Sequence, residues 1–208
     1  MGKGRFEAFS DGVFAIAITL LILEIHLPEA GTLNNDQMLQ YLAHLWPQLL
    51  TYITSFATIG IIWLNHHATF AQVKRVDRLT LVLNLLLLLT VCFVPFPTAL
   101  VAKYGPLPAS IVLYGATLTA LGVAYGVLWT HVVKCEHRAD PAHVPPLTWA
   151  TVRRGTYGTV VYFLATLLAF VAPRLSELLF IAVAVYYMFP GHLESSGPAA
   201  DALTSTTE

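Results

Sequence analysis

The polar residues Arg5, Ser10 and Asp11 lie in the first turns of an almost wholly apolar stretch that continues to Pro28. A second polar group, WLNHH at positions 63–67, ends the next apolar run. Ionisable groups are costly inside lipid, so residues of this kind either face water or have buried partners. A carboxylate beside an imidazole and an indole N–H is satisfied without water, and such groups can also carry protons or bind metal ions.

The sequence lacks the main catalytic motifs: the GxSxG of serine hydrolases, a Gly-rich phosphate loop and the HExxH of zinc proteases. The apolar runs also hold few groups able to exchange protons. We therefore predict that the chain is not an enzyme and needs no cofactor.

His66 and His67 are the strongest candidates for metal ligands, and Cys135, His137 and His143 could join them on paper. Neighbouring residues on a helix point about 100° apart, so the two histidines cannot easily bind one ion together. Cys135 and His137 fall in a stretch that the sequence predicts to be a solvated loop. We therefore expect no metal site, and a metalloenzyme built on the histidine pair is the weakest alternative.

Of the 208 residues, 56% are hydrophobic and only 11% are charged, against about a quarter charged in soluble domains. This composition indicates an integral membrane protein surrounded by a lipid bilayer, with no nucleic acid as partner. The first apolar run is longer than a signal peptide core, so we expect it to be retained as a helix. Cys92 lies in an apolar run and Cys135 in a polar one, so no disulfide is expected.

A helix needs about 20 residues to cross the hydrocarbon core of a bilayer. On this scale the apolar runs predict six spans: 6–27, 42–64, 79–102, 109–133, 156–171 and 175–189. Loop is predicted for the proline-containing segment 136–146, and disorder for 191–208, which is rich in Ser, Thr, Ala and Gly. The predicted fold is an all-α, six-helix membrane bundle over residues 1–190.

Lys and Arg are distributed unevenly among the predicted loops. One side of the membrane receives all of them except Lys103 and Arg174. The positive-inside rule places the basic side, and with it both termini, in the cytoplasm. The loop after the first span carries Glu29 and Asp36 without a basic residue, which suits an outside position or a mouth that attracts cations.

One broad face of the first predicted helix is mainly apolar, and Asp11 points away from it. That face comprises Phe9, Gly12, Ile16, Thr19, Leu20, Leu23 and Leu27. Arg5 and Asp11 are about 120° apart around the axis, so their partners must come from other helices, and residues 63–67 lie at the same level. Periodicity leaves open whether the apolar face is a packing seam or lines a narrow ion path, since Gly12 and Thr19 suit both.

The run RFEAFSDGVFAIAITLL at 5–21 closely resembles the first-helix motif of the transmembrane protein 175 family, the potassium channels of endosomes, lysosomes and many bacteria. The FSD triplet at 9–11 is the hallmark of that motif, and WLNHH at 63–67 extends the resemblance. The resemblance implies a homotetramer of six-helix chains in which the first helix lines a central pore.

The resemblance also implies roles for individual residues. Ile16 resembles the narrowest apolar constriction, Thr19 a hydroxyl layer that favours certain cations, and Leu23 a second apolar ring. Leu20 lies on the same stripe. The family's helix-locking polar network would comprise Arg5, Ser10, Asp11, Trp63 and His67.

The expected function is a potassium-permeable channel of the plasma membrane with a hydrophobic gate. No TVGYG filter occurs in the sequence, so selectivity is expected to be modest. The alternative is a proton-coupled carrier in which Asp11, Glu24 and the histidines titrate. Such carriers usually contain internal repeats and helices broken at the membrane centre, and the sequence predicts neither.

Overall fold

A computed structural model describes residues 2–25, 34–73, 76–139 and 149–188. Within these ranges every regular element is a helix, which confirms the all-α prediction. The predicted disordered tail at 191–208 and the candidate ligand His143 lie outside the described residues.

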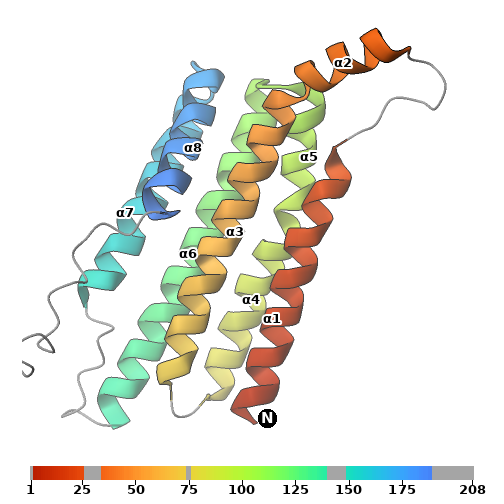
Figure 1. Cartoon of the computed structure of the whole chain (residues 1–208). Helices are drawn as coiled ribbons and strands as arrows, with labels where there is room; N and C mark the ends of the chain where they lie inside the picture. Colours follow the sequence, from red (N-terminus) through yellow and green to blue (C-terminus); the bar gives the residue numbers. More distant parts are fainter. Residues whose placement is uncertain (1, 26–33, 74–75, 140–148, 189–208) are drawn as a thin grey trace, which may run out of the picture.

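The chain runs up and down through a bundle of long helices (Figure 1). The elements are α1 (Lys3–Leu20), the 3₁₀ turn η1 (Leu21–Glu24), α2 (Asn35–His44), α3 (Trp46–Gln72), α4 (Arg78–Phe93), α5 (Pro95–Tyr104), α6 (Pro108–Ala139), α7 (Trp149–Leu168) and α8 (Pro173–Met188). Helix α1 lies at the edge of the bundle and packs against α3 and α4, whereas α6 packs against α4, α5, α7 and α8.

By length and composition, four helical segments of the described chain can cross a membrane. They are Lys3–Glu24, Trp46–Ala71, Arg78–Tyr104 and Pro108–Glu136. The fifth predicted span falls on α7, which has 20 residues, and the sixth falls on α8, which has 16. Neither helix is among these four segments. The chain is thus a multi-pass membrane protein, and the count of six spans stays a prediction.

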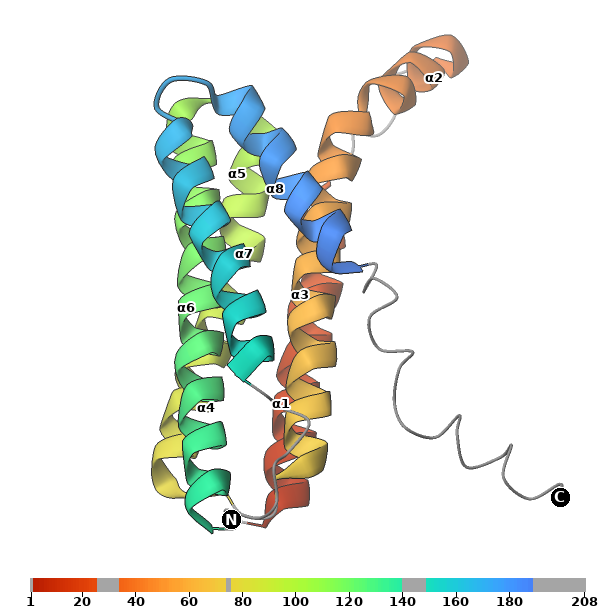
Figure 2. The same ribbon diagram turned by 90° about the vertical axis from the view of Figure 1, so that its left-hand side faces the viewer.

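Helix α2 is an element that the sequence analysis did not predict. A capping box starts it, because the Asn34 side chain accepts from the Gln37 N–H at 2.9 Å and the Gln37 side chain accepts from the Asn34 N–H at 2.9 Å. None of its residues is buried, and it projects from the bundle at the end opposite the N-terminus (Figure 2). The predicted second span therefore begins at Trp46 rather than at residue 42.

The third predicted span is two helices rather than one. Proline has no N–H to continue the ladder of α4, and the chain departs from it where Pro95 follows Val94. The Val94 N–H instead bonds the Val91 carbonyl at 3.2 Å, so the helix tightens before α5 begins.

Helix α6 extends well beyond the predicted span, and this corrects the placement of Cys135. The loop prediction for 136–146 was wrong over 136–139, because α6 continues to Ala139. Residues such as Lys134, Glu136 and Arg138 are good helix formers, and no proline follows Pro108 until Pro141. Cys135 therefore lies on the last turns of a helix.

Two apolar clusters fill the bundle. One joins α1, α3, α4 and α6 and includes Phe14, Ile59 and Leu87; the other joins α5 to α8 and includes Tyr114 and Phe180. In the second cluster α6 approaches its neighbours closely at Gly115. A Cβ there would collide with the Thr166 side chain and lie 2.6 Å from the ring of Phe180.

The close approach predicts that Gly115→Ala destabilises the protein, by about 1 to 3 kcal/mol from overpacking. Gly126→Ala is the matched control, because it lies on the same helix with nothing within 4 Å of its Cβ. The control should be neutral or stabilising by up to about 1 kcal/mol, since Ala favours helix over Gly. Thermal unfolding of the detergent-solubilised variants measures both changes in stability. Equal unfolding midpoints for the two variants would contradict the close contacts at Gly115.

Candidate functional site

Helix α1 is divided along its length into a buried and an exposed face. Its buried residues follow the helical repeat: Phe6, Ser10, Phe14, Ala17 and, at the start of η1, Leu21. They face α3 and α4, which cover this side of the helix. The packing thereby fixes the rotation of α1 about its own axis.

The opposite face of α1 is not covered by the chain itself. Ile16, Leu20 and Leu23 are 61%, 42% and 70% exposed, and Phe9, Gly12 and Thr19 are exposed beside them. This is the face that the sequence predicted; Leu27, its last member, lies outside the described residues. A continuous apolar face of this kind on a membrane helix needs either lipid or another protein surface against it.

Thr19 is the one hydroxyl residue among these exposed aliphatic side chains. Its hydroxyl donates to the Ile16 carbonyl at 2.9 Å, one turn earlier in the same helix. The proton is therefore directed back to the helix, and the oxygen lone pairs remain available on the exposed face.

Asp11 lies between the buried and the exposed face of α1, and a residue of α3 forms a hydrogen bond with it. The Trp63 indole N–H donates to the Asp11 carboxylate at 2.9 Å. The structure thus brings together two members of the predicted network. His67 is exposed, with its ring 6.0 Å from the ring of Trp63, and Arg5 is exposed at the start of α1.

A second, fully buried chain of hydrogen bonds joins α1, α4 and α3. Ser10 donates to the Phe6 carbonyl at 3.0 Å and accepts from the Asn84 amide at 3.0 Å. The Asn84 carbonyl oxygen lies 2.8 Å from Nε2 of His66. Because this oxygen can only accept, His66 carries its proton on Nε2 and donates it.

Asn84 and His66 are the network residues that the sequence analysis did not assign. A signal for Asn84 was present, since it is the only amide in the apolar run LTLVLNLLLLLTV at 79–91. The choice of His66 over its neighbour depends on aromatic packing, with the rings of Phe14 and Phe70 5.5 Å and 4.6 Å from its imidazole. The two histidines therefore point to different surroundings and do not form a shared metal site.

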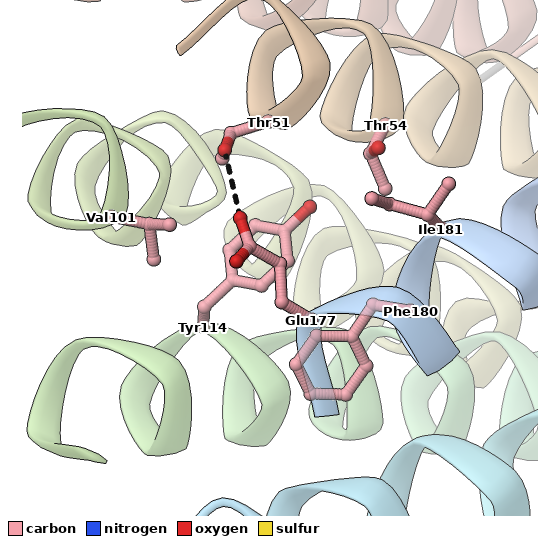
Figure 3. A pocket seen from close by; sticks show the side chains of 7 residues that line it. All are labelled: Thr51, Thr54, Val101, Tyr114, Glu177, Phe180 and Ile181. Atoms are coloured by element: carbon pink, nitrogen blue, oxygen red, sulfur yellow. Dashed lines mark hydrogen bonds between the residues drawn. The ribbon is translucent and has the colours of Figure 1, made fainter. Parts of the chain in front are cut away.

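Another polar cluster lies where α3, α6 and α8 begin, towards the end of the bundle opposite the N-terminus (Figure 1), and Figure 3 shows part of it. The Thr51 hydroxyl lies 3.5 Å from the Glu177 carboxylate, beside a cavity of about 10 Å³, roughly the smallest space that holds a water molecule. Next to it, the Ser55 hydroxyl contacts those of Thr98 and Tyr114 at 2.8 Å and 2.9 Å. These contacts tie α3 to α5, α6 and α8.

The buried chain predicts that Asn84→Leu destabilises the fold by about 1 to 3 kcal/mol, because the imidazole N–H of His66 loses its acceptor. Asn65→Leu makes the same exchange at an exposed position of α3 and should change stability by less than about 0.5 kcal/mol. Unfolding in mixed micelles of rising SDS content measures both. An equal loss of stability in the two variants would show that the buried hydrogen bonds of Asn84 do not stabilise the fold.

Comparison with known proteins places this arrangement in a family. The family model of the endosomal/lysosomal potassium channel TMEM175 matches residues 5–95, which contain the polar network and the exposed face of α1. A potassium channel of Streptomyces collinus is 42% identical over 191 residues, covering 90% of this chain and 92% of that protein. The human endosomal/lysosomal proton channel TMEM175 is 39% identical over 92 residues, which are 41% of this chain and 18% of that protein.

The crystal structure of a lysosomal potassium-selective channel TMEM175 homologue from Chamaesiphon minutus has the same fold. Its TM-score is 0.76 at 37% identity, covering 89% of this chain and 95% of that one. These relatives are channels, which confirms the prediction that the chain is not an enzyme. The chain belongs to the TMEM175 family.

Proposed function

We propose that the chain is a potassium-permeable channel in which four copies of α1 surround a central pore. The observation that carries this proposal is the uncovered apolar face of α1, whose rotation is fixed by buried contacts on its other side. In a homotetramer these faces would meet at the symmetry axis. The names of the bacterial relatives support potassium as the permeant ion.

The gate in this proposal is a set of apolar rings. Four copies of Ile16 form the narrowest ring, and Leu20 and Leu23 extend the apolar lining over about 10 Å of helix. A narrow apolar ring excludes water and with it the ions that water hydrates. The channel opens when α1 turns or moves so that Ile16 leaves the axis.

Ion preference in this proposal comes from Thr19. Its ring lies about one turn beyond Ile16 and presents hydroxyl oxygens whose protons bond the helix backbone. Oxygen lone pairs directed into the pore replace part of the hydration shell of a cation. The sequence contains no TVGYG filter, so the preference for potassium is modest.

The polar network sets the position of α1 relative to α3 and α4. Asp11 is bonded by Trp63, and Ser10 by Asn84. Arg5 and His67, both exposed, complete the network at the mouth or in contact with a neighbouring copy. Movement of α1 must break or exchange these bonds, which places them in control of opening.

The membrane arrangement in this proposal has six spans, with α4 and α5 counted as one. Both termini lie in the cytoplasm, because the loops on that side hold nearly all Lys and Arg residues. The membrane in this proposal is the plasma membrane.

Potassium efflux from liposomes containing the purified protein tests the gate. Ile16→Asn should raise the flux by a factor on the order of ten, because an amide ring stays hydrated where an isoleucine ring does not. Ile53→Asn is the matched control, as Ile53 is a similarly exposed isoleucine of α3, at 53% against 61%. The control should leave the flux near that of the wild type.

Two outcomes would contradict the proposal. The absence of flux from both the wild type and Ile16→Asn, with the protein shown to be folded and tetrameric, would exclude channel function. Slow, saturable flux that requires a proton gradient indicates the carrier instead.

Thr19→Val tests the source of selectivity, since it keeps the shape of the side chain and removes the oxygen. The potassium-to-sodium flux ratio should fall towards about 1. Thr90→Val is the control, because the Thr90 hydroxyl likewise donates one turn back, to Leu87 at 2.7 Å, but lies on α4. Equal ratios in wild type and Thr19→Val would show that the hydroxyl layer is not the filter.

A further inference from the structure

We propose that Asp77, His131 and Cys135 form a zinc-binding site where α4 begins and α6 ends. This site is separate from the pore residues and stands whether or not the proposed channel function is correct. The start of α4 and the end of α6 lie side by side, at the same end of the bundle as the N-terminus (Figure 2).

The donor atoms of the three side chains lie close together. One ligand atom from each lies within 4.8 Å of the other two. Nε2 of His131 is 3.2 Å from both carboxylate oxygens of Asp77 and 3.5 Å from Sγ of Cys135. His131 and Cys135 are one helical turn apart on α6, so their side chains share a face.

Two of these separations are close to those that a tetrahedral zinc ion requires. With ordinary Zn–N, Zn–O and Zn–S lengths, a nitrogen and an oxygen ligand lie about 3.4 Å apart and a nitrogen and a sulfur ligand about 3.6 Å apart. The observed Nε2–oxygen distance of 3.2 Å and Nε2–Sγ distance of 3.5 Å are close to these values. Sγ also lies 4.0 Å from Nδ1, beside the imidazole, so the Cys135 side chain must turn to bind an ion held on Nε2.

Asp77 can bind a metal while it still starts α4. Its Oδ1 accepts from the Thr80 N–H at 2.7 Å and the Thr80 hydroxyl at 2.5 Å, which leaves Oδ2 to a metal. The bonds from the Thr80 hydroxyl and N–H are the main reason that the pKa of Asp77 is lowered to about 2. The carboxylate is thus ionised at any ordinary pH.

The donor set identifies the class of ion. A thiolate, an imidazole and a carboxylate suit Zn²⁺ and other divalent transition metals, whereas Mg²⁺ and Ca²⁺ take oxygen ligands. A cavity of about 280 Å³ adjoins the site and is lined by Asp77, Cys135 and Glu136, so a water molecule can supply the fourth ligand. Asp77 is half exposed, which leaves the site open to ions from solution.

A simpler reading of the same contacts is a helix cap supported by a histidine. It accounts for the bonds of Asp77 to Thr80 and His131, and it assigns no role to the thiol. The two readings differ in whether Cys135 binds metal, and an experiment on the thiol separates them.

The experiment titrates Co²⁺, a spectroscopic substitute for Zn²⁺, into the untagged full chain in detergent. We expect one Co²⁺ per chain, a thiolate-to-cobalt charge-transfer band in the near ultraviolet, and loss of the band on adding Zn²⁺. Cys135→Ser should abolish the band, whereas Cys92→Ser, which removes the other cysteine, should keep it. His131→Ala and Asp77→Asn should weaken binding by roughly tenfold or more.

Asp77→Asn preserves the helix cap, so its effect reports the metal ligand. Zn²⁺ should also raise the thermal unfolding midpoint of the wild type and Cys92→Ser, and not that of Cys135→Ser. The proposal is overturned if the wild type shows no charge-transfer band, or if Cys135→Ser keeps it.

Discussion

The arrangement of α1 depends on one requirement: the buried polar groups beside it must all be hydrogen-bonded. Ser10, Asn84 and His66 come from three different helices and form a chain of three hydrogen bonds. An unpaired group in such surroundings costs about 1 to 3 kcal/mol, so other rotations of α1 are strongly disfavoured. With Ser10 turned inward, Ile16 lies about 120° around the axis of α1. Because the hydrogen bonds of Ser10 require its side of α1 to face the bundle, the apolar face of α1 is left exposed.

The bundle has two parts that differ in how their helices are joined. In the part formed by α6, α7 and α8, glycine makes room for side chains of neighbouring helices, at Gly115 for Phe180 and at Gly158 for Tyr187. Such contacts leave little room for one helix to move against another. In contrast, α1 is joined to α3 and α4 through apolar packing and a few directed hydrogen bonds. A short list of bonds can be exchanged in a discrete step, which is what a channel with distinct closed and open states requires.

Much of this could be predicted from the sequence, and the failures have physical reasons. The exposed face of α1 followed from helical periodicity, and the bond between Trp63 and Asp11 followed from helix direction and depth. Whether His66 or His67 joins the buried network depends on the rotation of α3 about its axis. A helix that is apolar on all sides does not determine that rotation. Asn84 could be recognised as unusual, but its partners come from two other helices. Helix α2 was missed although the pair Asn34 and Gln37 has the spacing of a capping box.

The interruption before Pro95 has a mechanical meaning for α1. Helix α4 holds the first half of α1 through Asn84, while α5 packs against η1 at its other end. The two ends of α1 are thus supported by two separate helices, α4 and α5, rather than by one continuous helix. The two helices meet at Pro95, which has no backbone N–H. A displacement at the first end is therefore not transmitted rigidly to the second.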